Sequence, residues 1–121
     1  MEVECVLRQS VLLIRLKGEL DHHQAGIMRE KVDGEAARYH VRSLLFNLGG
    51  LTFMDSSGVG ALLGRYRKIT AKGGRMALCE VPANISRITE ISGLARMIPL
   101  YEREAEALQH LLLGAPPARR S

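Results

Sequence analysis

Two short apolar runs constrain the fold of this sequence more than any other feature. Val11-Leu12-Leu13-Ile14 is apolar at four consecutive positions, so a strand formed there presents apolar side chains on both of its faces. Ser43–Leu48 (SLLFNL) is a second short and mostly apolar segment with the length of a buried strand. Strands buried on both faces lie inside sheets that helices cover. A helix-covered, largely parallel sheet is therefore expected.

Extended and helical patterns alternate along the chain, and Asp21 with Gln24 has the spacing of a helix N-cap and its N3 partner. The expected elements are strands at 3–8 and 11–17 joined by a turn at 9–10, a helix at 22–39, a strand at 43–48, a helix carrying Val59 to Ile69, a strand at 75–79, a helix from Pro82 to Gly93, a strand at 98–101, and a last helix with Ala105, Leu108 and Leu112 facing inward. This order predicts an α/β fold with a mixed, mostly parallel sheet of about five strands and about four flanking helices.

Length and composition fit one domain. The chain has 121 residues, of which 46% are apolar and 25% charged, as in average globular proteins. The domain is expected over residues 1–113, and the Pro-rich, basic segment 114–121 is expected to be a flexible tail. Cys5 and Cys79 have no metal-binding spacing and are interpreted as small buried hydrophobes. Free thiols and the lack of a signal-peptide pattern or spanning segment predict a cytoplasmic protein without a membrane partner.

The net charge of +4 comes from scattered basic residues. Aromatic residues do not interleave with them, and no motif of a nucleic-acid reader is present, so direct nucleic-acid binding is not expected. Arg65, Lys68 and Lys72 share one face of a predicted helix. Such stripes are usually solvated, although this one could steer an acidic partner.

The segment LTFMDSSGVGALL, residues 51–63, joins a strand to a helix. In open parallel sheets, ligands and partners gather at this end of the strands. The glycines do not complete a dinucleotide fingerprint, because Leu63 occupies the position of its third glycine. The segment also lacks the Gly-Lys-Ser/Thr of a P-loop and the glycine that precedes the serine of a nucleophile elbow. Close helix packing is the preferred interpretation of Gly58 and Gly60.

The adjacent Ser56 and Ser57 need separate explanations. A hydroxyl at a helix start usually caps the helix, with a contribution of about 1 kcal/mol, and one serine suffices for that. The spare serine is either plain surface polarity or a phosphate acceptor. A phosphate adds about −1.5 to −2 charge, which a helix N-terminus favours while a docked partner is repelled.

Two chemical alternatives involve the adjacent His22 and His23. Neighbouring helical residues point about 100° apart, so the two are not expected to share a metal ion. A Ser-His-Asp hydrolase would combine one of these histidines with Ser56 or Ser57 and with Asp21 or Asp55. Elbow and oxyanion-hole signals are missing, so no catalytic residue and no cofactor is predicted.

Three segments together identify a resemblance. They are VLLIRLKGELDHHQA, LLFNLGGLTFMDSSGVGALLGRYRKITAKGG, and ISGL at 91–94. They resemble the anti-sigma F factor antagonists of sporulating bacteria, a branch of the STAS-domain family. The resemblance covers roughly residues 3 to 113, and the GELDHH and FMDSSG-x-G motifs are complete.

The resemblance implies a phospho-switched binding protein rather than an enzyme. Members bind an anti-sigma factor that is also a serine kinase, and so release a sporulation sigma factor. The kinase phosphorylates the first serine of the DSSG motif, here Ser56, and a PP2C-type phosphatase resets it. Ser57 is then the structural serine, with Asp55 as a possible co-cap. The expected partner-binding residues are Asp21, His22, His23, Asp55, Ser56, Ser57, Gly58 and Gly60.

Alternatives remain at this point. A general stress-response antagonist would use a different anti-sigma kinase. A small serine hydrolase or nucleotidase would turn over a substrate without a partner, and a sensory STAS module would need an internal ligand pocket.

Overall fold

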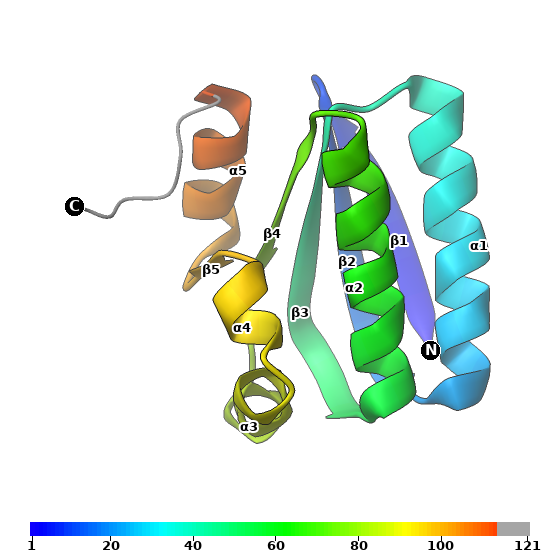
Figure 1. Ribbon diagram of the computed structural model, residues 1–121, viewed down its shortest axis with the longest axis vertical. Coiled ribbons are helices and arrows are strands. Elements are labelled where there is room, and N and C mark those ends of the chain that lie inside the picture. The colour runs from blue at the N-terminus through cyan, green and yellow to red at the C-terminus, as the bar shows by residue number, and fades with distance from the viewer. Residues whose placement is uncertain (114–121) are drawn as a thin grey trace.

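The computed structural model describes residues 1–113, which form a five-stranded sheet with helices on both faces (Figure 1). The elements are β1 (Glu2–Arg8), β2 (Val11–Leu20), α1 (His22–Tyr39), β3 (Ser43–Met54), α2 (Ser56–Ala71), β4 (Arg75–Cys79), α3 (Ala83–Ile91), α4 (Leu94–Met97), β5 (Leu100–Tyr101) and α5 (Glu104–Leu113). The strands lie in the order β1-β2-β3-β4-β5. β1 and β2 are antiparallel and the other pairs are parallel. The predicted α/β class and mixed, mostly parallel sheet are confirmed.

The central strands separate two cores of unequal size. Leu12, Ile14 and Phe46 point into the larger core, which α1, α2 and α3 cover. Leu13 and Leu45 point to the opposite face, into a smaller core that α5 covers. Both runs singled out in the sequence are buried on both faces, as their continuous apolar character predicted.

The two central strands are longer than predicted. β2 continues to Leu20, and β3 continues through Gly49-Gly50 to Met54, so the predicted strand end at residue 48 is wrong. A Cβ on Gly50 would lie 2.8 Å from the Leu16 carbonyl oxygen. The missing side chain therefore lets β3 follow β2 closely past a register shift.

Three details of the C-terminal half also differ from the prediction. Pro82 is the N-cap of α3 rather than its first residue, and a one-turn helix, α4, follows Gly93. Ala107 and Leu111 are the buried residues of α5, and Leu108 and Leu112 pack partly buried against the same core as predicted, whereas Ala105 is exposed. Which face of this short helix is buried depends on how it packs against β4, and periodicity alone does not determine that packing.

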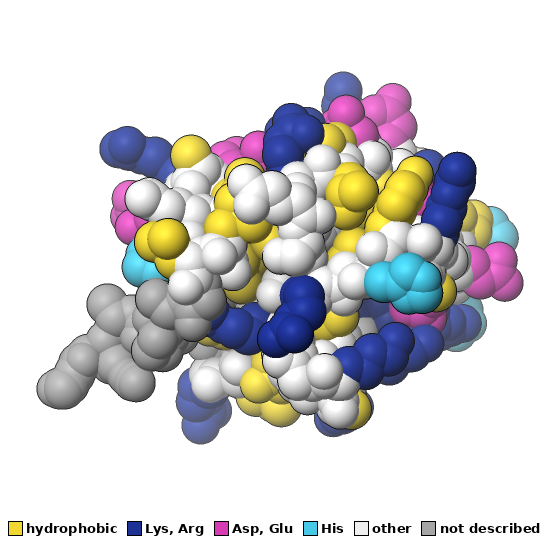
Figure 2. Space-filling view, turned by 90° about the horizontal axis from the view of Figure 1, so that it is seen from above, with side chains coloured by type: hydrophobic (Ala, Val, Ile, Leu, Met, Phe, Trp, Pro, Cys, Tyr) yellow, Lys and Arg dark blue, Asp and Glu magenta, His cyan; other side chains and the backbone are white. Residues whose placement is uncertain are grey.

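The cysteines and the surface charge agree with the sequence interpretation. Cys79 is fully buried, and burial raises the pKa of its thiol to about 12, while Cys5 is half-buried against the larger core. Viewed from the end of the molecule opposite the starts of α1 and α2, Lys and Arg side chains form several separate groups (Figure 2). Within residues 1–113, no helix has the length and apolar character that crossing a membrane requires. The tail predicted at 114–121 lies outside the described residues.

Candidate functional site

The starts of α1 and α2 lie at the same end of the sheet, where β2 and β3 finish side by side (Figure 1). Leu20 and Met54 are partners in the parallel register of these strands. The next residues, Asp21 and Asp55, each begin a helix. The segments DHH and DSSG, distant in sequence, are therefore brought together by the pairing of two neighbouring strands.

Two aspartates cap these helices. The Asp21 carboxylate accepts a hydrogen bond from the Gln24 amide at 2.9 Å, which confirms the predicted N-cap. The Asp55 carboxylate accepts from the Ser57 amide at 2.9 Å and from the Gly58 amide at 3.1 Å. The expectation that a serine caps α2 is wrong, because Asp55 precedes the helix in extended conformation and reaches both amides itself.

The two serines have different surroundings. Ser56 is the first residue of α2 and is exposed. Ser57 is half-buried, and its hydroxyl lies 3.2 Å from His22 Nδ1, a hydrogen bond that links the starts of the two helices. His22 and His23 are themselves exposed. The predicted division into a free and a structural serine is thus present, but Ser57 is fixed by His22 rather than by a capping role.

This arrangement does not assemble a hydrolase or a metal site. A serine and a histidine do meet, yet Asp21 and Asp55 both hold backbone amides as caps. Neither carboxylate orients the His22 ring, which a catalytic triad requires. Among residues 1–113, no three His, Cys, Asp or Glu side chains are grouped to hold a metal ion.

The two glycines after the serines also differ. Gly58 is buried, and a Cβ there would lie 2.7 Å from Met54 Cγ and 2.8 Å from the Leu20 carbonyl oxygen. Close packing therefore explains Gly58. Gly60 is exposed, and a Cβ there would meet no atom within 4 Å, so the packing interpretation is wrong for Gly60.

A groove of about 600 Å³ separates the first halves of α1 and α2. His22, His23, Gly26 and Arg29 of α1 line it, facing Ser57, Gly60, Gly64 and Arg65 of α2, and Ala25 and Ala61 complete it. It begins beside the two serines and continues along both helices. Most of its lining was not assigned to a site from the sequence, because residues of α1 and α2 meet only through tertiary packing.

Arg65 is the least expected member of this lining. Its side chain is only 6% exposed, and its Nε lies 2.9 Å from Asp33 Oδ1 of α1. Lys68 Nζ lies 3.1 Å from the other oxygen of Asp33. The stripe of basic residues on α2 is therefore not simply solvated. Burial lowers the pKa of Arg65, nearby Asp33 acts in the opposite direction, and Arg29 adds to the lowering.

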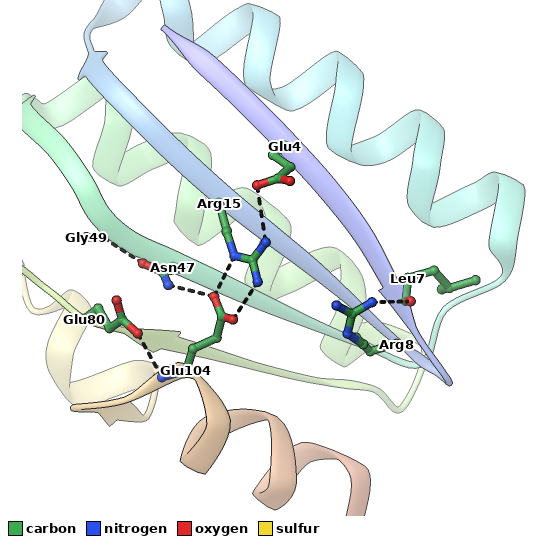
Figure 3. A network of polar contacts seen from close by, with 8 residues as sticks. All are labelled: Glu4, Leu7, Arg8, Arg15, Asn47, Gly49, Glu80 and Glu104. Atoms are coloured by element: carbon green, nitrogen blue, oxygen red, sulfur yellow. Dashed lines mark hydrogen bonds and ion pairs between the residues drawn. The ribbon is translucent and has the colours of Figure 1, made fainter.

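A second polar cluster lies on the other face of the sheet, around Arg15 of β2 (Figure 3). Arg15 donates two hydrogen bonds to Glu104 of α5, at 2.9 and 2.8 Å, and one to Glu4 at 3.3 Å. Asn47 also donates to Glu104, at 2.7 Å, and Glu80 accepts from the Glu104 amide. The Arg15 hydrogen bonds hold the pKa of Glu104 below its ordinary value. This cluster fastens the start of α5 to the sheet.

Comparison with known proteins agrees with this architecture. The STAS domain model matches residues 2–107. An anti-sigma F factor antagonist of Paenibacillus polymyxa is 40% identical over 111 residues, which cover 92% of this chain and 95% of that protein.

Two solved structures of SpoIIAA are also similar to the chain. The unphosphorylated anti-sigma factor antagonist SpoIIAA has a TM-score of 0.72 at 28% identity, covering 93% of this chain and 99% of that one. The phosphorylated Bacillus cell fate determinant SpoIIAA has a TM-score of 0.71 at 33% identity, covering 90% and 98%. With a family match over most of its length, this chain belongs to the STAS-domain family.

Proposed function

We propose that this chain is an anti-sigma F factor antagonist that a single phosphate switches off. In its unmodified form it binds an anti-sigma factor with serine kinase activity, and the sporulation sigma factor is released. The name of the Paenibacillus polymyxa relative and the two phosphorylation states of SpoIIAA support this proposal. The observation that carries it is the exposed Ser56 hydroxyl at the first position of a capped helix.

Ser56 is the proposed phosphate acceptor. It is exposed, whereas the neighbouring Ser57 hydroxyl is hydrogen-bonded to His22. A phosphate on Ser56 would stand at the positive end of α2, where about 0.3–1 kcal/mol of stabilisation is typical. The fold therefore tolerates the modification. The phosphate also places a new dianion in the interface with a docked partner. Like charges brought together at an interface weaken the binding free energy by several kcal/mol.

The proposed partner surface consists of the two helix starts. Asp21, His22, His23, Asp55, Ser56, Ser57, Gly58 and Gly60 form it. His22, His23, Ser56 and Gly60 are exposed and suited to direct contact. Gly58 is buried, so its contribution is to let the DSSG segment lie close to Leu20.

In this proposal the partner proteins catalyse the addition and the removal of the phosphate. The kinase supplies the phosphoryl transfer, and a PP2C-type phosphatase removes the phosphate from Ser56. The carboxylates beside Ser56 and His22 are engaged as helix caps, which agrees with a substrate and binder rather than an enzyme.

Incubation with the cognate kinase and ATP, followed by peptide mapping, tests the acceptor. One phosphate on Ser56 is expected, and Ser56→Ala should remain unmodified. Ser56→Asp should bind the kinase at least about tenfold more weakly than the wild-type chain. Ser10→Asp is the matched control, because it adds a similar charge at an exposed serine outside the proposed partner surface.

Three results would overturn the proposal. Phosphate on Ser57 or Thr52 would contradict the acceptor, and equal binding by Ser56→Asp would contradict the switch. Tighter binding to a general stress-response kinase in a parallel pull-down would place the chain in a different circuit.

A further inference from the structure

The groove between α1 and α2 contains helix glycines that the fold itself does not need. Adding a Cβ to Gly60 or Gly64 would meet no atom within 4 Å, and on Gly26 only the end of the Arg29 side chain, at 3.7 Å. Each glycine inside a helix costs roughly 0.5–1 kcal/mol relative to alanine. The open space is therefore kept at a cost in stability that no internal contact explains.

The positive charge beside this space is incompletely compensated. Arg65 and Lys68 share the single carboxylate of Asp33, and Arg29 stands close enough to repel Arg65. Both Nε and Nη1 of Arg65 are buried. Nε is in ion-pair contact with Asp33, whereas Nη1 has no hydrogen-bond partner among the described residues. A buried guanidinium with a donor that lacks an acceptor is costly unless a further acceptor is supplied.

We infer that the α1–α2 groove receives an acidic side chain of the partner kinase, with Arg65 as the residue that selects for a carboxylate. This inference rests on the proposed function, to which it adds a second contact beyond the serine pair. The groove opens beside His22 and Ser57, so a partner docked over Ser56 extends directly into it. Its volume of about 600 Å³ accommodates several side chains.

Binding of the purified cognate kinase to the unphosphorylated forms of two arginine variants tests the charge. Arg65→Met removes the cation and keeps an extended apolar side chain. Arg67→Met is the matched control, since Arg67 is exposed on the same helix and does not line the groove. Arg65→Met should weaken binding by about tenfold or more and reduce its salt dependence. Arg67→Met should stay within about twofold of wild type.

Two glycine variants test the space independently of the charge. Gly60→Ala partly fills the groove, whereas Gly34→Ala adds the same methyl group to an open, exposed position of α1 outside it. Both changes should raise the midpoint of thermal unfolding slightly, since each replaces a helix glycine. Only Gly60→Ala should weaken kinase binding, by about threefold to tenfold.

The outcomes separate this inference from the proposed function. Failure of the wild-type chain to bind, or equal binding by Ser56→Asp, overturns the proposed function and this inference with it. Normal binding by Arg65→Met and Gly60→Ala, with Ser56→Asp still impaired, overturns the groove alone. If Arg65→Met does not fold, the kinase binding of Gly60→Ala still tests whether the groove contacts the partner. Inorganic phosphate that shifts the amide resonances of Gly60 and Gly64 while leaving kinase binding unchanged identifies a free-anion site and also overturns the inference.

Discussion

Two arginines on opposite faces of the same sheet have opposite environments. Arg15 keeps 38% of its side chain exposed and still donates hydrogen bonds to the carboxylates of Glu104 and Glu4. Arg65 is almost completely buried, yet it has one carboxylate, which it shares with Lys68. Arg65 is the more buried guanidinium and therefore loses more hydration than Arg15, yet it has fewer carboxylate partners.

This difference separates a structural cluster from one suited to binding. The hydrogen bonds around Arg15 hold α5 against the strands, and Glu104 is also fixed by Asn47. The cluster around Arg65 borders a groove between the DHH and DSSG starts of α1 and α2. A buried donor without an acceptor beside open space, such as Nη1 of Arg65, is expected at a binding site, where an external partner supplies the acceptor.

The largest effect is expected from removing the carboxylate of Asp33. Asp33→Asn should lower the free energy of unfolding by about 2–3 kcal/mol, because a buried cation then loses its ion-pair partner. Arg65→Met should change it by less than about 1 kcal/mol, because a buried charge is replaced by an apolar side chain. Urea unfolding followed by circular dichroism measures both, since the chain has no Trp. Equal losses in the two variants would show that Arg65 is as well satisfied as Arg15.

A somewhat smaller loss is expected at the tight junction before α2. Gly58→Ala should lower the free energy of unfolding by about 1–3 kcal/mol, because the new methyl group meets Met54 and the Leu20 carbonyl oxygen. Gly60→Ala, two residues later, should instead raise it by about 0.5–1 kcal/mol. Thermal unfolding of the pair checks the sign of each change. Destabilisation by both would mean that the groove is closed in solution.

On the other face, Glu104→Gln should lower the free energy of unfolding by about 1–2 kcal/mol, since hydrogen bonds to a charged group are lost. Glu106→Gln is the control, because Glu106 is an exposed residue of the same helix turn. Hydrogen exchange of the α5 amides should increase in Glu104→Gln alone. Exchange that stays unchanged would show that apolar packing of α5 suffices to hold it.

The smallest expected effect is a difference in pH dependence. The folded-state pKa of Glu104 lies below its ordinary value, so its contribution is present above the unfolded pKa of about 4.3 and is lost as pH falls through the folded pKa. Arg15, Arg8, Glu4 and Glu80 are charged groups around it. The stability difference between wild type and Glu104→Gln should therefore narrow from pH 7 to pH 3 in urea titrations. A constant difference would show that the charge of Glu104 is unimportant.

Local features of the site were predictable from sequence, whereas its partners were not. Asp21 was predicted as an N-cap, and one of the two serines as spare, because both features depend on the few residues around a helix start. The choice of Ser56 as the spare serine came from the family resemblance. Asp55 was expected only as a possible co-cap beside a serine, and its capping of α2 without a serine was not predicted, since an Asp and a Ser at adjacent positions compete for the same amides. The burial of Arg65 was also missed, because Asp33 is on another helix.

The sequence alone determined the order of strands and helices, apart from the one-turn α4, and the identity of the DSSG junction. These follow from apolar periodicity and from short motifs, which act over a few residues. Only the tertiary structure decided which glycine is tightly packed and which borders open space, and which arginine has sufficient partners. The reason is that the separation of α1 and α2, and the reach from β2 to α5, arise from packing between segments that are far apart in the chain.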